Sequence, residues 1–437
     1  MNALRKFWIP WVAVLALGCF SDAFAQSYKI VDQGIDNPKD NFSMGMGLNA
    51  QGWTENMDGT VNPPEASLLT TVARGRAVIN AFGINIDLGT LGKPGANSWI
   101  NWGGINNLGE AVGQSETAEM DPNGEDICGF GTHLTCVPFI WRFFRMSALP
   151  TLGGYNGQAS AINNFGQVVG FAENGALDGT CPSFVVNNRV ALPALWGRQG
   201  TVDGLPLLPH DFDGFAFGIN DEGLAVGYSG NCIAATHAVV WKNNKADQLQ
   251  DLGGAGSNFA YVINDRGQIA GQVGAADNST GYAAVWLQGA DGPATNLGVV
   301  PGDASAFATG LNNRGQVVGN SLDASPSWAH GFFWDGGAII DFNTLIPADS
   351  NLFVINCSNI NDRGQVSGMG IVMSGPAKGE IHAFLATPSN ERLAAGMSIA
   401  DVTPVHPESN SQPMLMMMNK LLMQRTMQEM MTNQAAH

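Results

Sequence analysis

Apolar and polar positions follow one pattern that returns seven times along this chain. Each copy has a short apolar stretch ending in Leu or Ile and then a polar turn sequence, which in all but the first copy reads Asn-Asn/Asp-x-Gly. Most copies continue with Gln-Val-Val-Gly or a close variant. The seven turn glycines are Gly52, Gly109, Gly166, Gly223, Gly267, Gly315 and Gly364. Their spacing of 44 to 57 residues indicates a series of repeated structural units.

The residues around each turn predict a β-hairpin. In the third copy, small Ala159 and Ala161 alternate with other residues before Ile162, a period of two that is typical of a strand packed closely on its small side. Asn163 can accept hydrogen bonds from its own backbone at the start of a turn. Gly166 can adopt the positive φ that closes the hairpin. The Gln-Val-Val-Gly segment then begins the return strand.

Two further elements recur in the units. One is an aromatic strand, seen for example at 138–141, and the other is a short Asp-Leu-Gly strand, seen at 87–89. Four short strands in a unit of this size are typical of one blade of a β-propeller, and seven blades make a common ring. Residues 28–34 read as an additional Asp-Leu-Gly-like strand, which we expect to complete the last blade and close the ring. A linear β-solenoid is the alternative architecture.

These motifs resemble the HAF-repeat family of probable extracellular bacterial proteins. The His-Ala-Phe tripeptide of that family stands at His382-Ala383-Phe384, with variants starting at His237 and His330. The hairpin phrase and the stretch from Asp87 to Gly92 also match, and the resemblance covers Tyr28 to Ala386. The first unit departs from the pattern because it lacks Val-Val-Gly. The family is defined by its repeat, so the resemblance implies an exported repeat protein and assigns no catalytic residue.

The N-terminus reads as a secretory signal, residues 1–25. Arg5 and Lys6 precede an apolar core at 7–18, and Ala23-Phe24-Ala25 fits a cleavage site. A lipoprotein anchored at Cys19 is an alternative. No later stretch is long enough to cross a membrane. We therefore expect an exported protein, periplasmic or extracellular, with a propeller domain over 26–386 and a flexible linker over 387–413.

The charge balance limits the partners. The formal net charge is −17, and removal of residues 1–25 leaves 18 basic and 36 acidic residues, or −18. Binding to phosphate backbones requires a basic surface, so nucleic acid is not expected as a partner. An unknown protein or a glycan remains as the expected ligand.

Five cysteines follow the predicted signal. Cys128 and Cys136 bracket one insertion, and we expect them to form a disulfide, which an exported protein can keep. Cys181 and Cys232 lie in corresponding segments of neighbouring units, and a second disulfide between them is plausible. Cys357 stands at a small-residue strand position and is expected to be a buried free thiol. No Cys/His spacing fits a zinc site.

Two polar clusters are candidate sites. Asp121, Asn123 and Asp126 could supply oxygen ligands to calcium, although Asp-Pro-Asn-Gly is also an ordinary turn sequence. The second cluster is His210, Asp211 and Asp213, which could perform acid–base chemistry or could be a local loop variation. No other cofactor is expected.

A row of residues five before each turn Asn includes Phe215, Phe259 and Phe307 in consecutive units. These rings could form an aromatic surface in the central channel that binds a sugar or an apolar ligand. The alternative is that the row packs between the blades.

The last residues differ from the repeats. Residues 414–434 predict a Met-rich amphipathic helix, on which Met423, Met427 and Met430 share a face. The segment from Met414 to Met431 could dock on the propeller, self-associate or bind another protein's groove. Copper(I) bound by thioethers is a further alternative.

These observations favour an exported, non-catalytic binding or scaffold protein. A propeller-fold hydrolase acting on glycan is the alternative enzyme hypothesis, and it predicts carboxylates that converge near the axis. A structural cell-envelope or surface protein is the third hypothesis. The fold class does not discriminate among them.

Overall fold

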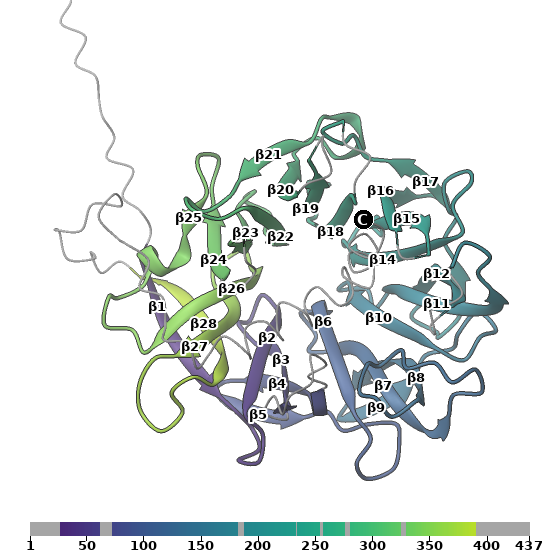
Figure 1. Cartoon of the computed structure of the whole chain (residues 1–437), viewed down its shortest axis with the longest axis horizontal. Helices are drawn as coiled ribbons and strands as arrows, with labels where there is room; N and C mark the ends of the chain where they lie inside the picture. The colour runs from purple at the N-terminus through teal and green to yellow at the C-terminus, as the bar shows by residue number, and fades with distance from the viewer. Residues whose placement is uncertain are drawn as a thin grey trace, which may run out of the picture.

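The computed structural model describes residues 27–61, 72–181, 188–232, 234–253, 257–275, 280–324 and 329–389. Within these residues the chain is all-β, with 28 strands and two short 3₁₀ helices. The predicted signal, the greater part of the linker and the predicted helix at 414–434 lie outside the described residues. The strands form seven units of four, arranged around a common centre (Figure 1).

The units follow one another along the chain, and their strands are as follows. Unit 1 contains β2 (Phe42–Leu48), β3 (Thr54–Val61), β4 (Val72–Ala81) and β5 (Ile84–Asp87). Unit 2 contains β6 (Ser98–Ile105), β7 (Ala111–Met120), β8 (Leu134–Arg142) and β9 (Arg145–Ala148). Unit 3 contains β10 (Gly157–Ile162), β11 (Val168–Leu177), β12 (Arg189–Trp196) and β13 (Val202–Gly204). Unit 4 contains β14 (Asp213–Ile219), β15 (Ala225–Asn231), β16 (Ala234–Lys242) and β17 (Lys245–Gln248).

The remaining units have the same plan. Unit 5 contains β18 (Phe259–Ile263), β19 (Ile269–Gly274), β20 (Gly281–Trp286), the 3₁₀ helix η1 (Gly289–Asp291) and β21 (Thr295–Gly298). Unit 6 contains β22 (Ser305–Leu311), β23 (Val317–Leu322), β24 (Ala329–Trp334) and β25 (Ile340–Asp341), followed by η2 (Phe342–Leu345). Unit 7 contains β26 (Leu352–Ile360), β27 (Val366–Val372), β28 (Ile381–Ser389) and the N-terminal β1 (Ser27–Gly34).

The N-terminal strand joins the last unit, as its sequence predicts. Strand β1 pairs antiparallel with β28, from Ser27 opposite Ser389 to Gly34 opposite Ala383. Tyr28 is buried, and its ring centroid lies 4.8 Å from that of Phe342. Because β28 continues to Ser389, residues 387–389 are strand, and the expected linker boundary is three residues too early.

The first and last units are in contact. Strand β2 of unit 1 has a parallel pair with β28 of unit 7, at Phe42 and Ile381. The Asn361 side chain of unit 7 also donates a hydrogen bond to the Asn49 carbonyl of unit 1. A linear stack would keep its two end units apart, so the described residues contradict the β-solenoid alternative.

The inner strands depart from strict alternation. In β10 the register shifts between Ala159 and Ala161, and β14 shifts in the same way between Ala216 and Gly218. The shift skips one residue just before the turn, which locally bends a strand. The sequence-based expectation of unbroken alternation is therefore wrong at this position.

Small residues and tryptophans set the packing of the units. A Cβ added at Gly170 of the Val-Val-Gly segment would lie 1.9 Å from the Gln158 carbonyl oxygen, so only glycine fits there. The Trp196, Trp241 and Trp286 side chains are fully buried, and each indole N–H donates to a backbone carbonyl at 2.7 Å. Burial of large rings with satisfied N–H groups makes these positions structural.

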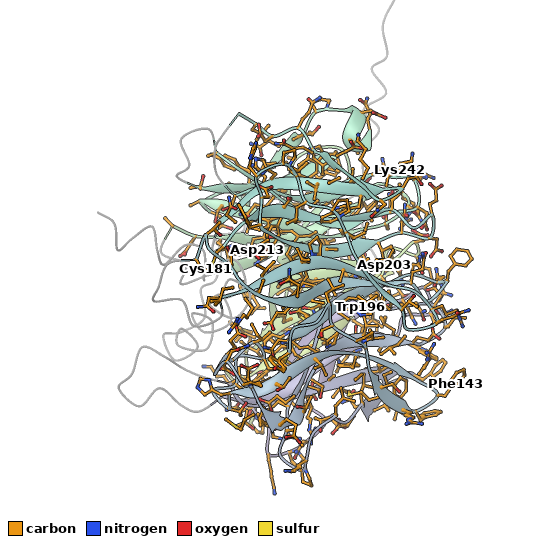
Figure 2. All side chains as sticks on the ribbon, turned by 90° about the vertical axis from the view of Figure 1, so that its right-hand side faces the viewer. Phe143, Cys181, Trp196, Asp203, Asp213 and Lys242 are labelled. Carbon is orange, nitrogen blue, oxygen red and sulfur yellow. A yellow bond between two sulfur atoms is a disulfide. The ribbon has the colours of Figure 1, made fainter. Side chains whose placement is uncertain are left out.

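In units 1 to 6 the four strands pair antiparallel in chain order, so the turn from the first to the second strand and the turn from the third to the fourth lie at the same end. In unit 7 the turn from β26 to β27 lies at this end. We call this end the turn face. Figure 2 shows Phe143, Asp203 and Lys242 along this side, with Cys181 and Asp213 toward the other. No helix in the described part of the chain is long and apolar enough to cross a membrane.

Candidate functional site

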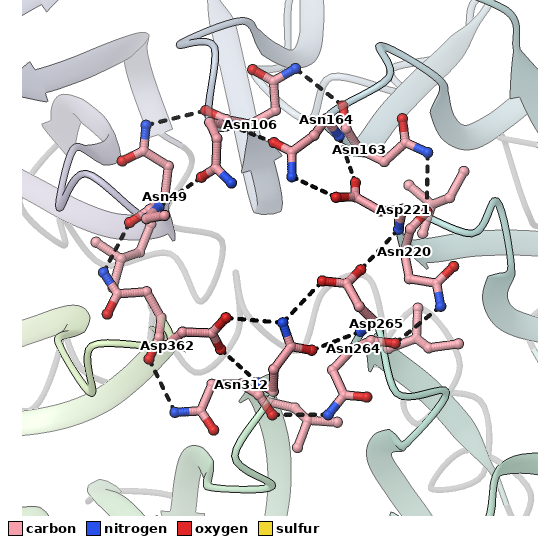
Figure 3. A pocket seen from close by; sticks show the side chains of 18 of the residues that line it. Asn49, Asn106, Asn163, Asn164, Asn220, Asp221, Asn264, Asp265, Asn312 and Asp362 are labelled. Atoms are coloured by element: carbon pink, nitrogen blue, oxygen red, sulfur yellow. Dashed lines mark hydrogen bonds between the residues drawn. The ribbon is translucent and has the colours of Figure 1, made fainter.

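The seven turn asparagines form a cyclic hydrogen-bond ring around the axis of the turn face (Figure 3). Each side-chain amide donates to the backbone carbonyl of the corresponding Asn in the next unit, at 2.9 to 3.1 Å. The members are Asn49, Asn106, Asn163, Asn220, Asn264, Asn312 and Asn361. The oxygen of each side chain serves its own turn: Asn163 Oδ1 accepts from the N–H groups of Phe165 and Gln167.

A second ring lies beside the first and is open at one place. The backbone N–H of the residue after each Asn donates to the side chain of its counterpart in the next unit, at 2.7 to 3.0 Å. The acceptors are Asn107, Asn164, Asp221, Asp265, Asn313 and Asp362. Unit 1 has Ala50 at this position, which has no side-chain oxygen, so its neighbour Asp362 lacks this acceptor.

These two rings line a polar pocket of about 190 Å³ on the axis. Its walls are residues 48–50, 105–107, 162–164, 219–221, 263–265, 311–313 and 360–362, three from each unit. Most of these polar groups form hydrogen bonds with one another, so the two rings connect neighbouring units. Their exposed carboxylates give the pocket a negative charge.

Aromatic side chains cross the axis near this pocket. The ring of Trp102 in unit 2 lies 5.7 Å from that of Tyr261 in unit 5, and Asn359 of unit 7 donates to the Trp102 carbonyl at 2.6 Å. Tyr261 also lies 5.1 Å from Phe217 of unit 4. Side chains from four units thus meet across the centre.

The predicted aromatic row joins this cluster. Phe215, Phe259 and Phe307 are 8%, 2% and 8% exposed. Phe215 packs on Phe217 at 4.5 Å, and both Phe259 and Phe307 pack on Tyr261, at 5.6 and 6.3 Å. The structure brings the three phenylalanines into one central aromatic core and buries their faces.

The turn face carries an unusual group of exposed apolar side chains over units 1 to 3, which we call the apolar arc. Its members, with their exposed fractions, are Phe82 (85%), Ile84 (66%), Leu108 (62%), Phe143 (89%), Phe144 (82%) and Phe165 (61%). Two pairs are supported by neighbours: Trp53 packs on Phe82 at 5.4 Å, and Trp141 packs on Phe144 at 5.6 Å. Exposed apolar patches of this kind are uncommon on monomeric soluble proteins.

Three residues of the apolar arc also have a left-handed backbone conformation, which is uncommon for phenylalanine. Phe82, Phe143 and Phe144 have φ values of 55°, 52° and 60°. Unit 4 has Asn243 and Asn244 in the corresponding turn, the residue type that tolerates this region best. Phenylalanine there costs about 1–2 kcal/mol per residue. Backbone strain combined with full exposure is typical of residues kept for contact with something else.

The other side of the turn face is basic, and we call it the basic arc. Units 5, 6 and 7 place Arg266, Arg314 and Arg363 at the turn position where units 2 and 3 place Leu108 and Phe165, and all three arginines are exposed. The chain has only 20 basic residues against 37 acidic ones, so a row of three arginines is conspicuous. The turn face therefore carries the apolar arc over units 1 to 3 and a row of exposed arginines over units 5 to 7.

Comparison with known proteins identifies no family for this chain. No protein-family model matches this sequence, and no curated protein matches it either. Among solved structures, an acylaminoacyl peptidase of Pyrococcus horikoshii is similar with a TM-score of 0.45 and 10% identity, over 82% of this chain and 54% of the peptidase. The chain thus spans about half of the peptidase's length.

Two further similar structures bind sugars according to their descriptions. A Trypanosoma rangeli sialidase in complex with sialic acid has a TM-score of 0.36 and 8% identity, over 84% of this chain and 58% of the sialidase. An Aleuria aurantia lectin in complex with a fucosylated sugar has a TM-score of 0.29 and 8% identity, over 86% of this chain and 100% of the lectin. Similarities this weak assign no activity.

The predicted His210, Asp211 and Asp213 do not form one group. Asp211 accepts hydrogen bonds from the Ser229 hydroxyl at 2.7 Å and lies 3.2 Å from Nδ1 of His237. His210 is exposed in the loop, with a φ of 76°.

Asp213 is instead paired with Asp178. Burial and the hydrogen bond shared with Asp178 raise the pKa of Asp213 to about 8. Burial works to raise the pKa of Asp178 too, but hydrogen bonds from Asp213 and Thr180 hold it below its ordinary value. The two carboxyls thus share one proton near neutral pH, and neither lines the axial pocket.

The same His–Asp contact recurs in other units. His330 Nδ1 lies 3.0 Å from Asp303, and His382 Nδ1 lies 2.9 Å from Asp32. Burial opposes protonation, but the hydrogen bonds and charges of these aspartates raise the pKa of His330 and of His382 overall. His237 and His330 therefore fix the segments that lead into their own units, whereas His382 of the intact His-Ala-Phe tripeptide ties β28 to β1 through Asp32.

The predicted calcium ligands contact different partners. Asp121 accepts from the N–H groups of Asn123 and Glu125, at 2.7 and 3.0 Å. Asn123 Oδ1 accepts from Arg189 at 2.7 Å, and Asp126 accepts from the Gly131 N–H at 2.8 Å. These contacts order the insertion of unit 2.

A buried carboxylate cluster lies next to this insertion. The Asn156 amide nitrogen is within 3.4 Å of oxygens of Asp121, Glu125 and Glu173. Burial, together with the charge of Glu125, raises the pKa of Glu173 to about 7, against the hydrogen bonds from Asn156 and Tyr155. Glu173 is therefore partly protonated near neutral pH.

Both expected disulfides are confirmed. Cys128 pairs with Cys136 within unit 2, and Cys181 pairs with Cys232 across units 3 and 4. Cys357 is a buried free thiol, and burial raises its pKa. Among the described residues, atoms close enough for one metal ion belong to Asp178, Cys181 and Cys232, but the disulfide removes both thiolates as ligands.

Sequence reasoning missed three features of the turn face and the core. The inter-unit role of the turn Asn was detectable, because Asp never replaces it in seven copies whereas Asp is frequent at the next position. The apolar arc was detectable as Leu108 and Phe165 at a turn position that the other units fill with Gln, Glu or Arg. The central contact of Trp102 with Tyr261 had no sequence signal.

Proposed function

We propose that this chain is a closed seven-bladed β-propeller that is exported and acts as a non-catalytic binding or scaffold protein through its turn face. The closed ring of seven turn asparagines, the β2–β28 pair and the β1–β28 pairing support closure. The two disulfides accord with an oxidising compartment and hence with the predicted signal at 1–25.

The observation that carries this proposal is the apolar arc. Six large apolar side chains are more than 60% exposed on one side of one face. Keeping them there costs stability twice, through hydration of apolar surface and through the positive φ of Phe143 and its neighbour. Such a surface gains free energy when a partner covers it.

The composition of the face favours a protein partner. Phenylalanine and arginine are both enriched at protein interfaces, whereas lysine is depleted, and the basic arc contains arginine alone. A partner with an apolar patch beside carboxylates would complement both arcs. The acidic remainder of the molecule would disfavour acidic partners elsewhere.

The test compares capture of extracytoplasmic proteins from the producing cells by three immobilised full-length chains. The first is the native chain, and the second carries Leu108→Arg, Phe165→Arg, Phe143→Asn and Phe144→Asn, each the residue type of a sibling unit. The third carries Met120→Gln and Leu177→Gln on the opposite face as a control.

We expect one set of proteins to bind the native and control chains and to bind the second chain at least about tenfold less, as loss of a buried anchor predicts. Equal capture by all three chains would exclude the turn face as the binding surface. No capture by any chain would favour the structural, envelope-protein hypothesis.

A glycan hydrolase is the second candidate because of one observation, the proton shared by Asp178 and Asp213. Paired carboxylates with separated pKa values are the acid and base of many glycosidases. Asp213→Asn would abolish hydrolysis of a soluble glycan panel if this pair were catalytic. This candidate would be removed if the Asp213→Asn chain hydrolysed glycans as well as the native chain does, or if the native chain hydrolysed none.

A further inference from the structure

The described chain ends on the turn face. Ala386 of β28 pairs with Val366, directly after the unit 7 turn. Beyond it, Thr387 accepts a hydrogen bond from the Gln365 side chain at 3.3 Å, and a Cβ added at the turn glycine Gly364 would lie 3.2 Å from Pro388. The segment that follows Ser389 therefore starts on the face that carries both arcs.

The apolar arc begins in the adjoining unit. Unit 7 contacts unit 1 through the hydrogen bond from Asn361 to Asn49. Unit 1 contributes Phe82 and Ile84, which are 85% and 66% exposed. The end of β28 and the start of the arc are thus neighbours on the ring.

The chain beyond Ser389 has a matching composition. Residues 414–431 contain eight of the 17 methionines in the protein, together with three leucines, among only three charged residues. Methionine side chains adapt to irregular surfaces and make favourable contacts between sulfur and aromatic rings. The arc offers four phenylalanines and two aliphatic side chains to such a segment.

The intervening length permits the contact. Residues 390–413 separate the last strand from the Met-rich segment, and 24 residues span at most about 80 Å. That upper bound exceeds the distance across one face of a ring of this size. An intramolecular partner also acts at an effective concentration on the order of millimolar, which a second molecule does not reach in solution.

We infer that residues 414–431 dock on the apolar arc of the same chain and act as a built-in competitor for the turn face. The inference rests on the proposed function, because it names the resident occupant of the same surface. It provides a cover for the six large apolar side chains that the described part of the chain leaves exposed. A partner would then have to displace the Met-rich segment, and its apparent affinity would be lowered by that competition.

The experiment places a photo-cross-linker on the arc of the full-length chain. Phe143→p-benzoylphenylalanine keeps an aromatic side chain at an exposed position, and Leu177→p-benzoylphenylalanine on the opposite face is the control. After irradiation, the cross-linked peptides are identified by mass spectrometry, and gel mobility separates links within one chain from links between two chains.

We expect Phe143→p-benzoylphenylalanine to link to residues 414–431 within one chain, and the control to give no such link. Links to the same segment of a second chain would replace the inference by tail-mediated self-association. Links to other segments alone, or none, would overturn it.

A second measurement does not depend on cross-linking chemistry. The full-length chain with Met423→Ser, Met427→Ser and Met430→Ser should expose the arc and raise bis-ANS fluorescence by about twofold, as uncovering an apolar patch predicts. The arc substitutions described above should abolish that rise. Unchanged fluorescence in the Met→Ser chain would contradict docking.

The two hypotheses fail in different ways. If the cross-link forms but the Met→Ser chain captures no protein, docking stands and the proposed function fails. If the native chain captures a partner through the arc and no cross-link forms, the proposed function stands and docking fails.

Discussion

The turn asparagines carry two tasks that no other side chain combines. The oxygen of Asn163 accepts two N–H groups of its own turn, and its amide donates to the Asn220 carbonyl of the next unit. Aspartate could perform the first task but not the second, because an ionised carboxylate has no N–H to donate. At the following position the side chain accepts from a backbone N–H, which both Asp and Asn can do, and both residue types occur there.

Because the two positions have different hydrogen-bonding roles, substitutions at Asn106 and Asn107 should lower the free energy of unfolding by different amounts. Asn106→Asp removes the donor to the Asn163 carbonyl and places a carboxylate beside Glu110, so it should lower the free energy of unfolding by about 1–3 kcal/mol. Asn107→Asp keeps the acceptor for the Ala50 N–H, so it should change the free energy of unfolding by less than about 0.5 kcal/mol. Urea denaturation measures the free energy of unfolding of both variants. An equal decrease in both would refute the donor role of the turn asparagines.

Glu55 is the most anomalous single residue. It stands where units 2, 3 and 4 have Val112, Val169 and Val226, it is fully buried, and neither carboxylate oxygen has a hydrogen-bond partner. Its carboxyl group fills space against Gly104: a Cβ added there would lie 2.1 Å from Oε2. Burial raises the pKa of Glu55 well above its ordinary value.

Glu55→Val should therefore stabilise the fold. At about pH 8 the gain should be about 1–3 kcal/mol, because a buried polar group without a partner is removed. The raised folded-state pKa means that Glu55 costs least at low pH and most as pH rises, so the gain should shrink toward about pH 4. Denaturant midpoints at both pH values measure this, with Glu55→Gln as a variant that removes the ionisation but keeps a buried polar group. A loss of stability in Glu55→Val would show that Glu55 has a partner in solution.

Strand β1 shows how an element from the start of the described chain completes the last unit. It pairs along β28 from Ser27 opposite Ser389 to Gly34 opposite Ala383, so it covers the edge of β28 that β27 leaves free. Tyr28 anchors the pair by packing against Phe342 and Phe333, with ring centroids at 4.8 and 6.3 Å. The Tyr28 hydroxyl is buried without a hydrogen-bond partner, and burial raises its pKa.

Two substitutions at Tyr28 separate packing from polarity. Tyr28→Ala should cost about 3–5 kcal/mol, because it removes a buried ring from the junction of the two ends of the chain. Tyr28→Phe keeps the ring and removes an unpaired hydroxyl, so it should be neutral or stabilising by up to about 1 kcal/mol. Thermal unfolding of the two variants tests this; a large loss in Tyr28→Phe would mean that the hydroxyl is bonded.

The turns between the third and fourth strands of units 2 and 4 have the same backbone conformation but different residues. The turn between β16 and β17 uses Asn243 and Asn244, whereas the turn between β8 and β9 uses Phe143 and Phe144 at the same backbone angles. The two turns thus share positive φ values although only one has the residue type that favours them. Phenylalanine does not stabilise such a turn, so we assign the role of Phe143 and Phe144 to the surface that they form.

The molecule as a whole should be most stable on the acidic side of neutrality. Burial and neighbouring acids raise the folded-state pKa of Glu173 to about 7 and of Asp213 to about 8, so the folded protein holds protons that the unfolded chain releases. The stabilisation of these groups is fully present near pH 4 and is lost as pH rises through those values. His330 and His382 act in the same direction, because Asp303 and Asp32 raise their pKa against the effect of burial.

We therefore expect the melting temperature to fall by several degrees between about pH 5 and pH 8, as linkage requires. Asp178 does not alter this trend, because its pKa is lowered and it is ionised in both the folded and the unfolded chain over this range. Differential scanning calorimetry at several pH values measures it, and Asp213→Asn should reduce the slope above about pH 6. A melting temperature that rises over this range would contradict the raised pKa values.

Much of the architecture follows from the sequence because it is local and repeated. The Asn-x-x-Gly turns, the small residues at Ala159 and Gly170 and the aromatic strands each specify a short element, and seven copies reinforce one interpretation. The pairing of Cys128 with Cys136 is equally local. The register shift in the inner strands was not predictable, because no residue type marks it.

The repeats thus specify the units and their turns, since hydrogen bonds within a turn or hairpin depend on residues only a few positions apart. Contacts between units are different, because the curvature of the ring decides which side chains meet. That curvature aligns six of the turn asparagines with the carbonyl 44 to 57 residues ahead and Asn361 with the carbonyl of Asn49. The curvature likewise joins Asp213 to Asp178 and brings Trp102 against Tyr261. It also gathers the six residues of the apolar arc on one face, where spacing along the chain could not place them together.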